Sequence, residues 1–210
     1  MKIPEEIRKL SDDLIWAFYD LDEFKIIFTD DPNGVRLLND TAPTFFTKLV
    51  EYYWNRFILS ISRFTDPSKQ GQFENLSIDV LEKIASQAGM PDLQQLSEKI
   101  RKIKKEAVPI KKFRSKYIAH RDLERAVITD LKQETIYLEQ VEMILKDMGD
   151  CINLCLQFFK APPILFGQMS NPRGARSLMY YLRQGAIYAE LKEKRRDLLK
   201  DEEEESSSSY

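Results

Sequence analysis

The chain has few of the residues that build metal sites, disulfide frameworks or turn-rich folds: one histidine, two cysteines and seven glycines among 210 residues. Seven glycines argue against a sheet with many tight turns. Two cysteines are too few for a disulfide framework, and a zinc site needs about four ligands. Cys151 and Cys155 lie one helical turn apart. That spacing suits a metal pair, but buried core cysteines are the favoured interpretation.

The sequence also lacks long apolar runs and a strong net charge. No uninterrupted stretch reaches the 18 or so apolar residues of a membrane helix, and residues 1–6 lack the apolar region of a signal peptide. The formal net charge is −2, so global charge indicates no partner. We therefore expect a soluble, cytoplasmic protein that neither crosses nor binds a membrane.

Apolar residues recur in steps of three and four, which is the periodicity of an amphipathic helix. Ile7, Leu10 and Leu14 begin one such stripe. Pro109 is expected to kink or split the fourth helix. Turn and loop signals occupy 30–34 and 66–76, with Ser77 as a cap for the third helix and Gly89 as its end. The predicted helices span 4–29, 42–65, 77–89, 91 to beyond 110, 137–158 and 174–200.

These elements predict an all-α protein, an antiparallel helical bundle with a C-terminal helical extension. The bundle is expected over 1–160. A linker and a helix follow over 161–200, and 201–210 form an acidic, serine-rich tail that is expected to be disordered. The last helix interleaves basic residues with Tyr180, Tyr181 and Tyr188. Packing of these tyrosines onto the bundle is favoured over stacking on RNA, and a dimer arm is a third interpretation.

A basic segment gives the clearest chemical signal, because residues 98–125 hold eleven lysines and arginines but only four acidic residues. Such a surface attracts phosphate groups, although a solvated helix face is the alternative. The segment contains His120, whose side chain is suited to proton transfer at neutral pH. On an ideal helix, Arg114 and His120 border the apolar stripe on opposite sides, at about +40° and −80° from Ile110 and about 9 Å apart along the axis. A histidine that caps a helix C-terminus is the alternative interpretation.

Arg114, five residues and then His120, near the end of a basic helix, resemble the R-x(4–6)-H motif of the HEPN superfamily. Two further stretches narrow the resemblance. Ile61-Ser-Arg-Phe-Thr-Asp-Pro67, followed by Glu74-Asn-Leu-Ser77, together with Ala119-His-Arg-Asp122, resemble the abortive-infection, AbiU-type branch. The resemblance covers about residues 1–160.

The resemblance implies a HEPN-like bundle and a metal-independent endoribonuclease of phage defence or a toxin–antitoxin pair. Such an enzyme acts as a homodimer with a composite cleft, needs no cofactor and can have an antitoxin partner. His120 would be the general acid/base, and Arg114 would hold the phosphate of the RNA. Asp122 would orient His120. The strand would be held by Lys111, Lys112, Lys116 and Arg121.

One residue departs from the family pattern. Active members often carry Asn, Asp or His after the motif arginine, where this chain has Ser115. The sequence therefore leaves a second function open, in which the chain is a non-catalytic HEPN module that binds RNA, a nucleotide or a protein partner.

Overall fold

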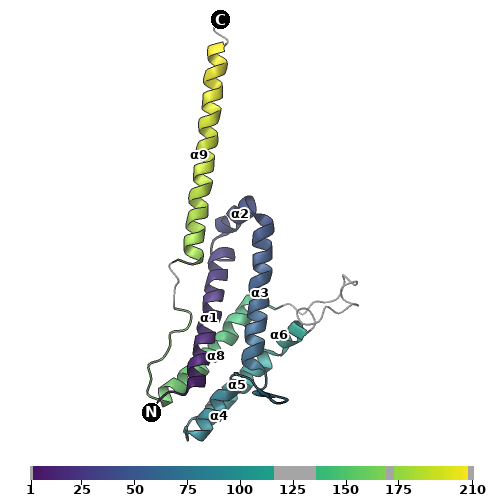
Figure 1. The fold of residues 1–210 in the computed structure, drawn as a ribbon, viewed down its shortest axis with the longest axis vertical. Coiled ribbons are helices and arrows are strands. Elements are labelled where there is room, and N and C mark those ends of the chain that lie inside the picture. Colours follow the sequence, from purple (N-terminus) through teal and green to yellow (C-terminus); the bar gives the residue numbers. More distant parts are fainter. Residues whose placement is uncertain (1, 116–135, 169–172, 208–210) are drawn as a thin grey trace, which may run out of the picture. The chain divides into compact units, whose positions relative to one another are not determined.

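The computed structural model describes residues 2–115, 136–168 and 173–207, with side chains as far as 196 in the last range. Within these ranges the chain is almost entirely helical (Figure 1), and the all-α prediction is confirmed. The exception is a short antiparallel hairpin of β1 (Lys69–Gln70) and β2 (Phe73–Glu74), in a segment predicted to be a loop. The helices are α1 (Glu5–Phe28), α2 (Pro32–Thr41), α3 (Pro43–Thr65), α4 (Asp79–Gln87), α5 (Leu93–Glu106), α6 (Val108–Phe113), α8 (Leu138–Phe158) and α9 (Ala175–Ser207).

The chain divides into two compact units. The first comprises Met1–Asp22 and Leu49–Ser170, and the second comprises Glu23–Lys48 and Asn171–Tyr210. Helices α1 and α3 contribute to both units, because each crosses a boundary between them.

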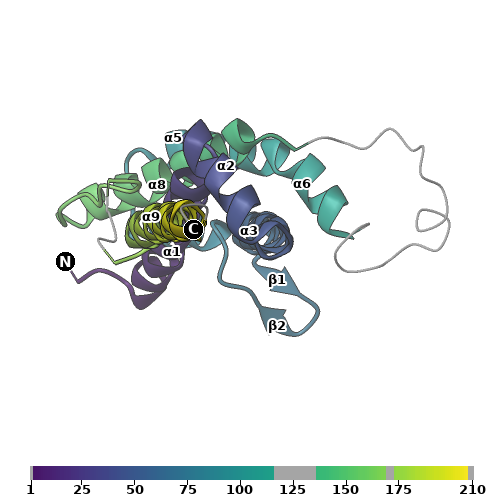
Figure 2. The same ribbon diagram turned by 90° about the horizontal axis from the view of Figure 1, so that it is seen from above.

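In the first unit, α1 and α3 are antiparallel neighbours. Arg56 on α3 pairs with Asp20 on α1 at 2.6 Å. Arg63 comes later on α3 but pairs with Asp13, which comes earlier on α1, so the two helices run in opposite directions. Figure 2 shows α6 and the β1–β2 hairpin flanking α3. Helix α6 and the hairpin are therefore the elements that surround the C-terminal end of α3.

The core of the first unit is the set of apolar stripes seen in the sequence. Complete burial of one Leu, Ile or Phe side chain stabilises a fold by roughly 1.5–3 kcal/mol, so these stripes are the main reason why the helices associate. The residues of the core that are at most 2% exposed include Ile7, Leu10, Leu14, Phe57, Ile61, Leu81, Leu96, Ile100, Ile103, Ile144 and Met148.

Helix α4 ends as its sequence predicts but does not begin as predicted. Gly89 has a φ of 69°, and the N–H of Met90 bonds to the Ala85 carbonyl, so glycine closes the helix with a left-handed residue. Ser77, however, is fully buried, and its hydroxyl has no hydrogen-bond partner, so it does not cap the helix. Ala88, the residue that follows α4, is exposed.

The second unit contains a helix, α2, that is not among the predicted ones. Asp30-Asp-Pro-Asn-Gly34 looks like a turn, but the Asp31 carboxylate caps α2 by accepting the N–H of Asn33 at 3.0 Å. Arg183 on α9 binds the same carboxylate at 2.6 Å. Gly34 lies against Met179, where a Cβ would come within 3.0 Å of the Met179 Cε atom.

On α9, Tyr180, Tyr181 and Tyr188 are 56%, 70% and 69% exposed, so within the second unit the tyrosines are not the residues that pack α9 against α2. Met179, which is 2% exposed, fills that role against α2. The helix continues to Ser207, into the acidic segment for which disorder is predicted. Glutamate is a good helix former, which accounts for this continuation.

Candidate functional site

Arg114 lies at the end of α6, a six-residue helix that follows α5 after Ala107 and carries Pro109 in its first turn. Pro109 has no N–H to donate, so it is accommodated in the first turn of a helix and not in a helix interior. The predicted fourth helix is therefore split, with Ala107 between its two parts. Arg114 and Ser115 adopt a π-helical turn, a variation that is frequent at functional sites.

The partner of Arg114 is Asp66, the residue that follows α3. Arg114 Nη1 lies 3.0 Å from Asp66 Oδ2, and Lys111 Nζ lies 3.1 Å from Asp66 Oδ1. Lys111 and Arg114 are three residues apart, so they share one face of the helix and reach the same carboxylate together. The three side chains are only 20–30% exposed. The group thus has two positive charges, one negative charge and limited contact with water.

The ionisation of Asp66 reflects these neighbours. Burial opposes the charged form of the carboxyl, but hydrogen bonds from Arg114 and Lys111 outweigh it and hold the pKa of Asp66 below its ordinary value. Asp66 is therefore ionised at neutral pH, and its two cations remain paired with it.

Hydrogen bonds to backbone carbonyls hold the loop that carries Asp66. The Asn75 side chain donates to the Pro67 carbonyl at 2.9 Å, and the Asn75 N–H donates to the Ser68 carbonyl at 2.8 Å. The N–H of Ile78 donates to the Phe64 carbonyl at 2.8 Å. Lys111 Nζ also donates to the Thr65 carbonyl at 3.2 Å. The stretches 61–67 and 74–77, which carry the family resemblance, thus meet beside Arg114.

The structure brings some of the predicted site residues together. Arg114 and Lys111 share Asp66, whereas Lys112 and Ser115 are exposed. Asp66 itself was missed as a functional candidate, although it stands within the quoted stretch 61–67. The remaining predicted residues, Lys116, His120, Arg121 and Asp122, lie outside the described residues.

Acidic residues on neighbouring helices neutralise much of the basic segment. Lys102 Nζ lies 2.8 Å from Asp147 on α8, and Lys104 Nζ lies 2.6 Å from Asp79 on α4. Lys99 makes a looser pair with Asp150 at 4.0 Å. For α5, the alternative of a charged, solvated helix face therefore fits well. The phosphate-binding interpretation is then best applied to α6.

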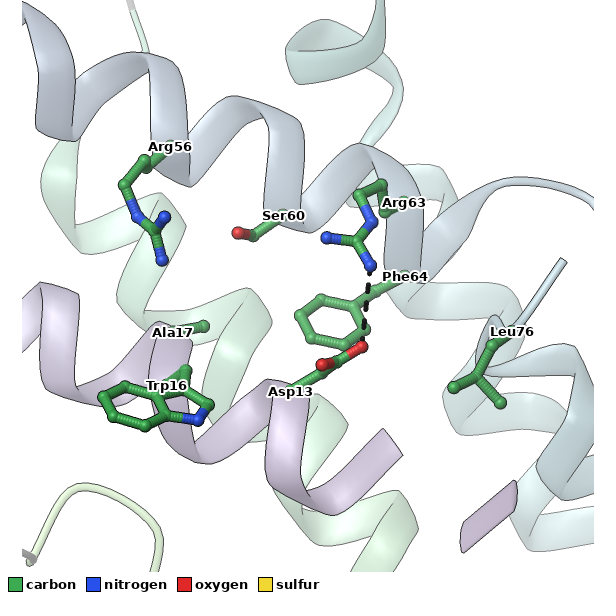
Figure 3. Close-up of a pocket in the computed structure, with 8 residues that line it drawn as sticks. All are labelled: Asp13, Trp16, Ala17, Arg56, Ser60, Arg63, Phe64 and Leu76. Atoms are coloured by element: carbon green, nitrogen blue, oxygen red, sulfur yellow. Dashed lines mark ion pairs between the residues drawn. The ribbon is translucent and has the colours of Figure 1, made fainter. Parts of the chain in front are cut away.

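A hollow lies between α1 and α3 in the first unit, with a volume of about 170 Å³. It exists because the small residues Ala17 and Ser60 line the gap between the two helices (Figure 3). Arg63 points across it towards Asp13, at 3.6 Å, while Arg56 is held by Asp20. Each arginine is matched by a carboxylate, so the hollow has no excess of positive charge to attract phosphate.

The acidic and sulfur-containing residues do not form a metal centre in the described part of the chain. Cys151 and Cys155 are 0% and 1% exposed, and burial raises the pKa of each thiol to about 12. They are therefore protonated core residues, and their predicted burial is confirmed. Among the described residues, no three His, Cys, Asp or Glu side chains are grouped closely enough to hold a metal ion. No described helix combines the length and apolar composition needed to cross a bilayer.

Comparison with known proteins agrees with the motif. The family model of AbiU2, a HEPN family, matches residues 3–161, well over half of the chain. No curated protein and no solved structure matches the chain. The matched region contains α1 to α8, both stretches beside Arg114, and the 114–120 motif. The chain therefore belongs to the AbiU2 family of HEPN domains, which is associated with abortive infection.

Proposed function

We propose that the protein is a metal-independent endoribonuclease of a phage-defence or toxin–antitoxin system, with Arg114 and His120 as its catalytic residues. The observation that carries this proposal is the fixed, partly buried position of Arg114. Its guanidinium is held by Asp66 at 3.0 Å, at the end of the helix that leads into the segment with His120. A guanidinium has five N–H donors, and the described bond to Asp66 uses Nη1. Arg114 can therefore bind a phosphate oxygen while Asp66 holds it.

The reaction that these residues support is cleavage of RNA through its own 2′-hydroxyl. A base removes the 2′-hydroxyl proton, the 2′-oxygen bonds to phosphorus, and the bond to the 5′-oxygen breaks. An acid protonates the departing oxygen, which leaves a 2′,3′-cyclic phosphate and a 5′-hydroxyl. A homodimer would supply two copies of His120, one as base and one as acid. Arg114 would stabilise the negative charge that develops on the phosphate oxygens.

The proposal is tested by cleavage of single-stranded RNA in EDTA with three variants. His120→Ala is expected to lower the rate by about 10²–10⁴-fold, the usual contribution of a general acid–base residue. Arg114→Ala should lower it by a comparable factor. Arg101→Ala is the matched control, because Arg101 is an exposed arginine on α5 of the same basic segment. It should leave the rate nearly unchanged. The products should carry a 2′,3′-cyclic phosphate.

Two results would contradict the nuclease proposal. Equal cleavage by the wild type and His120→Ala would show that the histidine is not used. Loss of wild-type cleavage on addition of EDTA would show that the chemistry depends on a metal ion.

A binding module without catalysis is the second candidate, and Ser115 is the observation that favours it. Ser115 is exposed at the position where active relatives often carry Asn, Asp or His. In this case the wild type would bind RNA or a nucleotide without cleaving RNA, and Arg114→Ala would weaken binding while His120→Ala would not. Retained binding with no product therefore distinguishes the two candidates.

A further inference from the structure

We propose that Asp66 is a positioning residue for Arg114, one that raises the rate of RNA cleavage while lowering the affinity for RNA. This inference rests on the proposed nuclease function, because it assigns to Asp66 the task of aiming the phosphate-binding arginine. It is carried by three observations: the two hydrogen-bonded pairs on one carboxylate, the fixed backbone of that carboxylate, and the charge of the group.

The pairing geometry leaves Arg114 little freedom. Each oxygen of Asp66 takes a different cation, with Lys111 on Oδ1 and Arg114 on Oδ2. Because both oxygens are engaged, the carboxylate cannot rotate without breaking a bond. A long arginine side chain has many rotamers, and this contact selects the one that reaches Asp66.

The backbone that carries Asp66 is fixed from two sides. Asn75 and Ile78 close the loop after α3 with bonds to the Pro67 and Phe64 carbonyls. Lys111 binds the carbonyl of Thr65 as well as the Asp66 carboxylate, so α6 is attached to the end of α3 by both main chain and side chain. Arg114 is therefore aimed from a rigid position.

The negative charge of Asp66 helps to aim Arg114 but lowers the affinity of the group for a phosphate. Two cations and one carboxylate leave a single net positive charge for an incoming phosphate. With side chains only 20–30% exposed, water screens the repulsion between Asp66 and a phosphate less than it would at the surface. An asparagine would remove this repulsion, but its amide has only one acceptor oxygen for two cations. Arg114 would then be attracted more freely to any phosphate and aimed less well at the scissile one.

The test compares Asp66→Asn with Asp147→Asn. Asp147 is the matched control, since its side chain is 22% exposed against 20% for Asp66 and its pair with Lys102 is 2.8 Å long. Each variant loses one carboxylate from the first unit. Turnover is measured on a single-stranded RNA, and Kd on the same sequence with 2′-deoxy residues, which cannot be cleaved.

Asp66→Asn should bind the deoxy strand several-fold more tightly and cleave the RNA at least about tenfold more slowly, since small misplacements of catalytic groups cost this much or more. The gain in affinity should be greatest at low salt. Asp147→Asn should stay close to wild type in both measurements. A variant of Asp66 that merely destabilised the fold would lose turnover and affinity together.

Asp66→Glu separates charge from position and serves if Asp66→Asn does not fold. It keeps the negative charge but moves it by one methylene, so affinity should match wild type while turnover falls. Unchanged turnover in both Asp66 variants, or weaker binding by Asp66→Asn, would overturn the proposal. If the wild type binds RNA without cleaving it, the nuclease proposal fails by itself. The affinity of Asp66→Asn then still decides whether Asp66 opposes binding.

Discussion

Asp66 and its two cations connect parts of the chain that are distant in sequence. Asp66 and Arg114 are 48 residues apart, yet the loop after α3 and the end of α6 meet at this one carboxylate. A partly buried pair of this kind contributes to stability only while both partners are charged. The same contact that positions Arg114 therefore also makes the fold sensitive to acid.

Stability should fall at low pH because of Asp66. Its folded-state pKa lies below the ordinary value of 3.8, so its contribution is complete above that value and is lost as the pH falls through the folded-state pKa. Urea unfolding at pH 7 and at pH 3 should show that Asp66→Asn reduces the difference in unfolding free energy between the two. Asp40→Asn, at an exposed pair of 3.8 Å with Arg36, should follow the wild-type pH dependence. A wild-type pH dependence in Asp66→Asn would contradict this assignment.

At the residue scale, the sequence predicts the cations of the site but not their partner. Arg114 and Lys111 are found from a local motif and a run of basic residues. Asp66 could not be found in this way, because nothing in its local spacing indicates a contact with a residue 48 positions away. Its place within the stretch 61–67 was the available signal. His120 stays a prediction, since it lies outside the described residues.

The element scale was largely predictable from apolar periodicity. Each end of α1, α3 and α8 lies within one residue of its predicted position, because long amphipathic stripes define a helix strongly. Helix α2 was missed because Asp31 and Pro32 are typical of turns and also of helix starts. The hairpin of β1 and β2 was missed because its strands have two residues each, too few for any alternation to be seen.

A glycine in the middle of α8 shows how packing can reverse a helix preference. Alanine is normally better than glycine in a helix by about 1 kcal/mol. At Gly149, however, an added Cβ would lie 2.7 Å from the Phe166 ring. That ring also stacks on Phe18, with 5.8 Å between the centroids, so it cannot move away freely. The segment after α8 thus depends on the absence of a side chain at this position.

Gly149→Ala should therefore destabilise the protein by about 1–3 kcal/mol, the usual cost of overpacking. Gly185→Ala on α9 is the control, because nothing lies within 4 Å of the Cβ that it adds. It should be neutral or stabilising by up to about 1 kcal/mol. Urea titrations followed by circular dichroism would measure both. Stabilisation by Gly149→Ala would mean that the Phe166 ring yields easily.

At the scale of the whole molecule, the family match and the compact units have different limits. The match ends at residue 161, whereas α9 begins at Ala175 and belongs to the second unit together with α2. Helix α9 carries the apolar side chains of Ile187 and Leu191, which are 51% and 60% exposed. The sequence predicted a separate C-terminal helix here. It did not predict that residues 23–48 share a unit with that helix, because this grouping depends on tertiary contacts.

The two buried cysteines of α8 can serve as a chemical probe of how often the first unit opens. A thiol reagent reacts with the thiolate, and at pH 8 a buried thiol with a pKa of about 12 offers almost none of it. Modification must then wait for α8 to open, so its rate should be slow in buffer and rise with denaturant in parallel with unfolding. Rapid modification in buffer would contradict the burial of these residues. Both cysteines belong to the first unit. The rate of their modification would therefore measure the opening of the unit that holds Arg114, even in a sample where α9 is already unfolded.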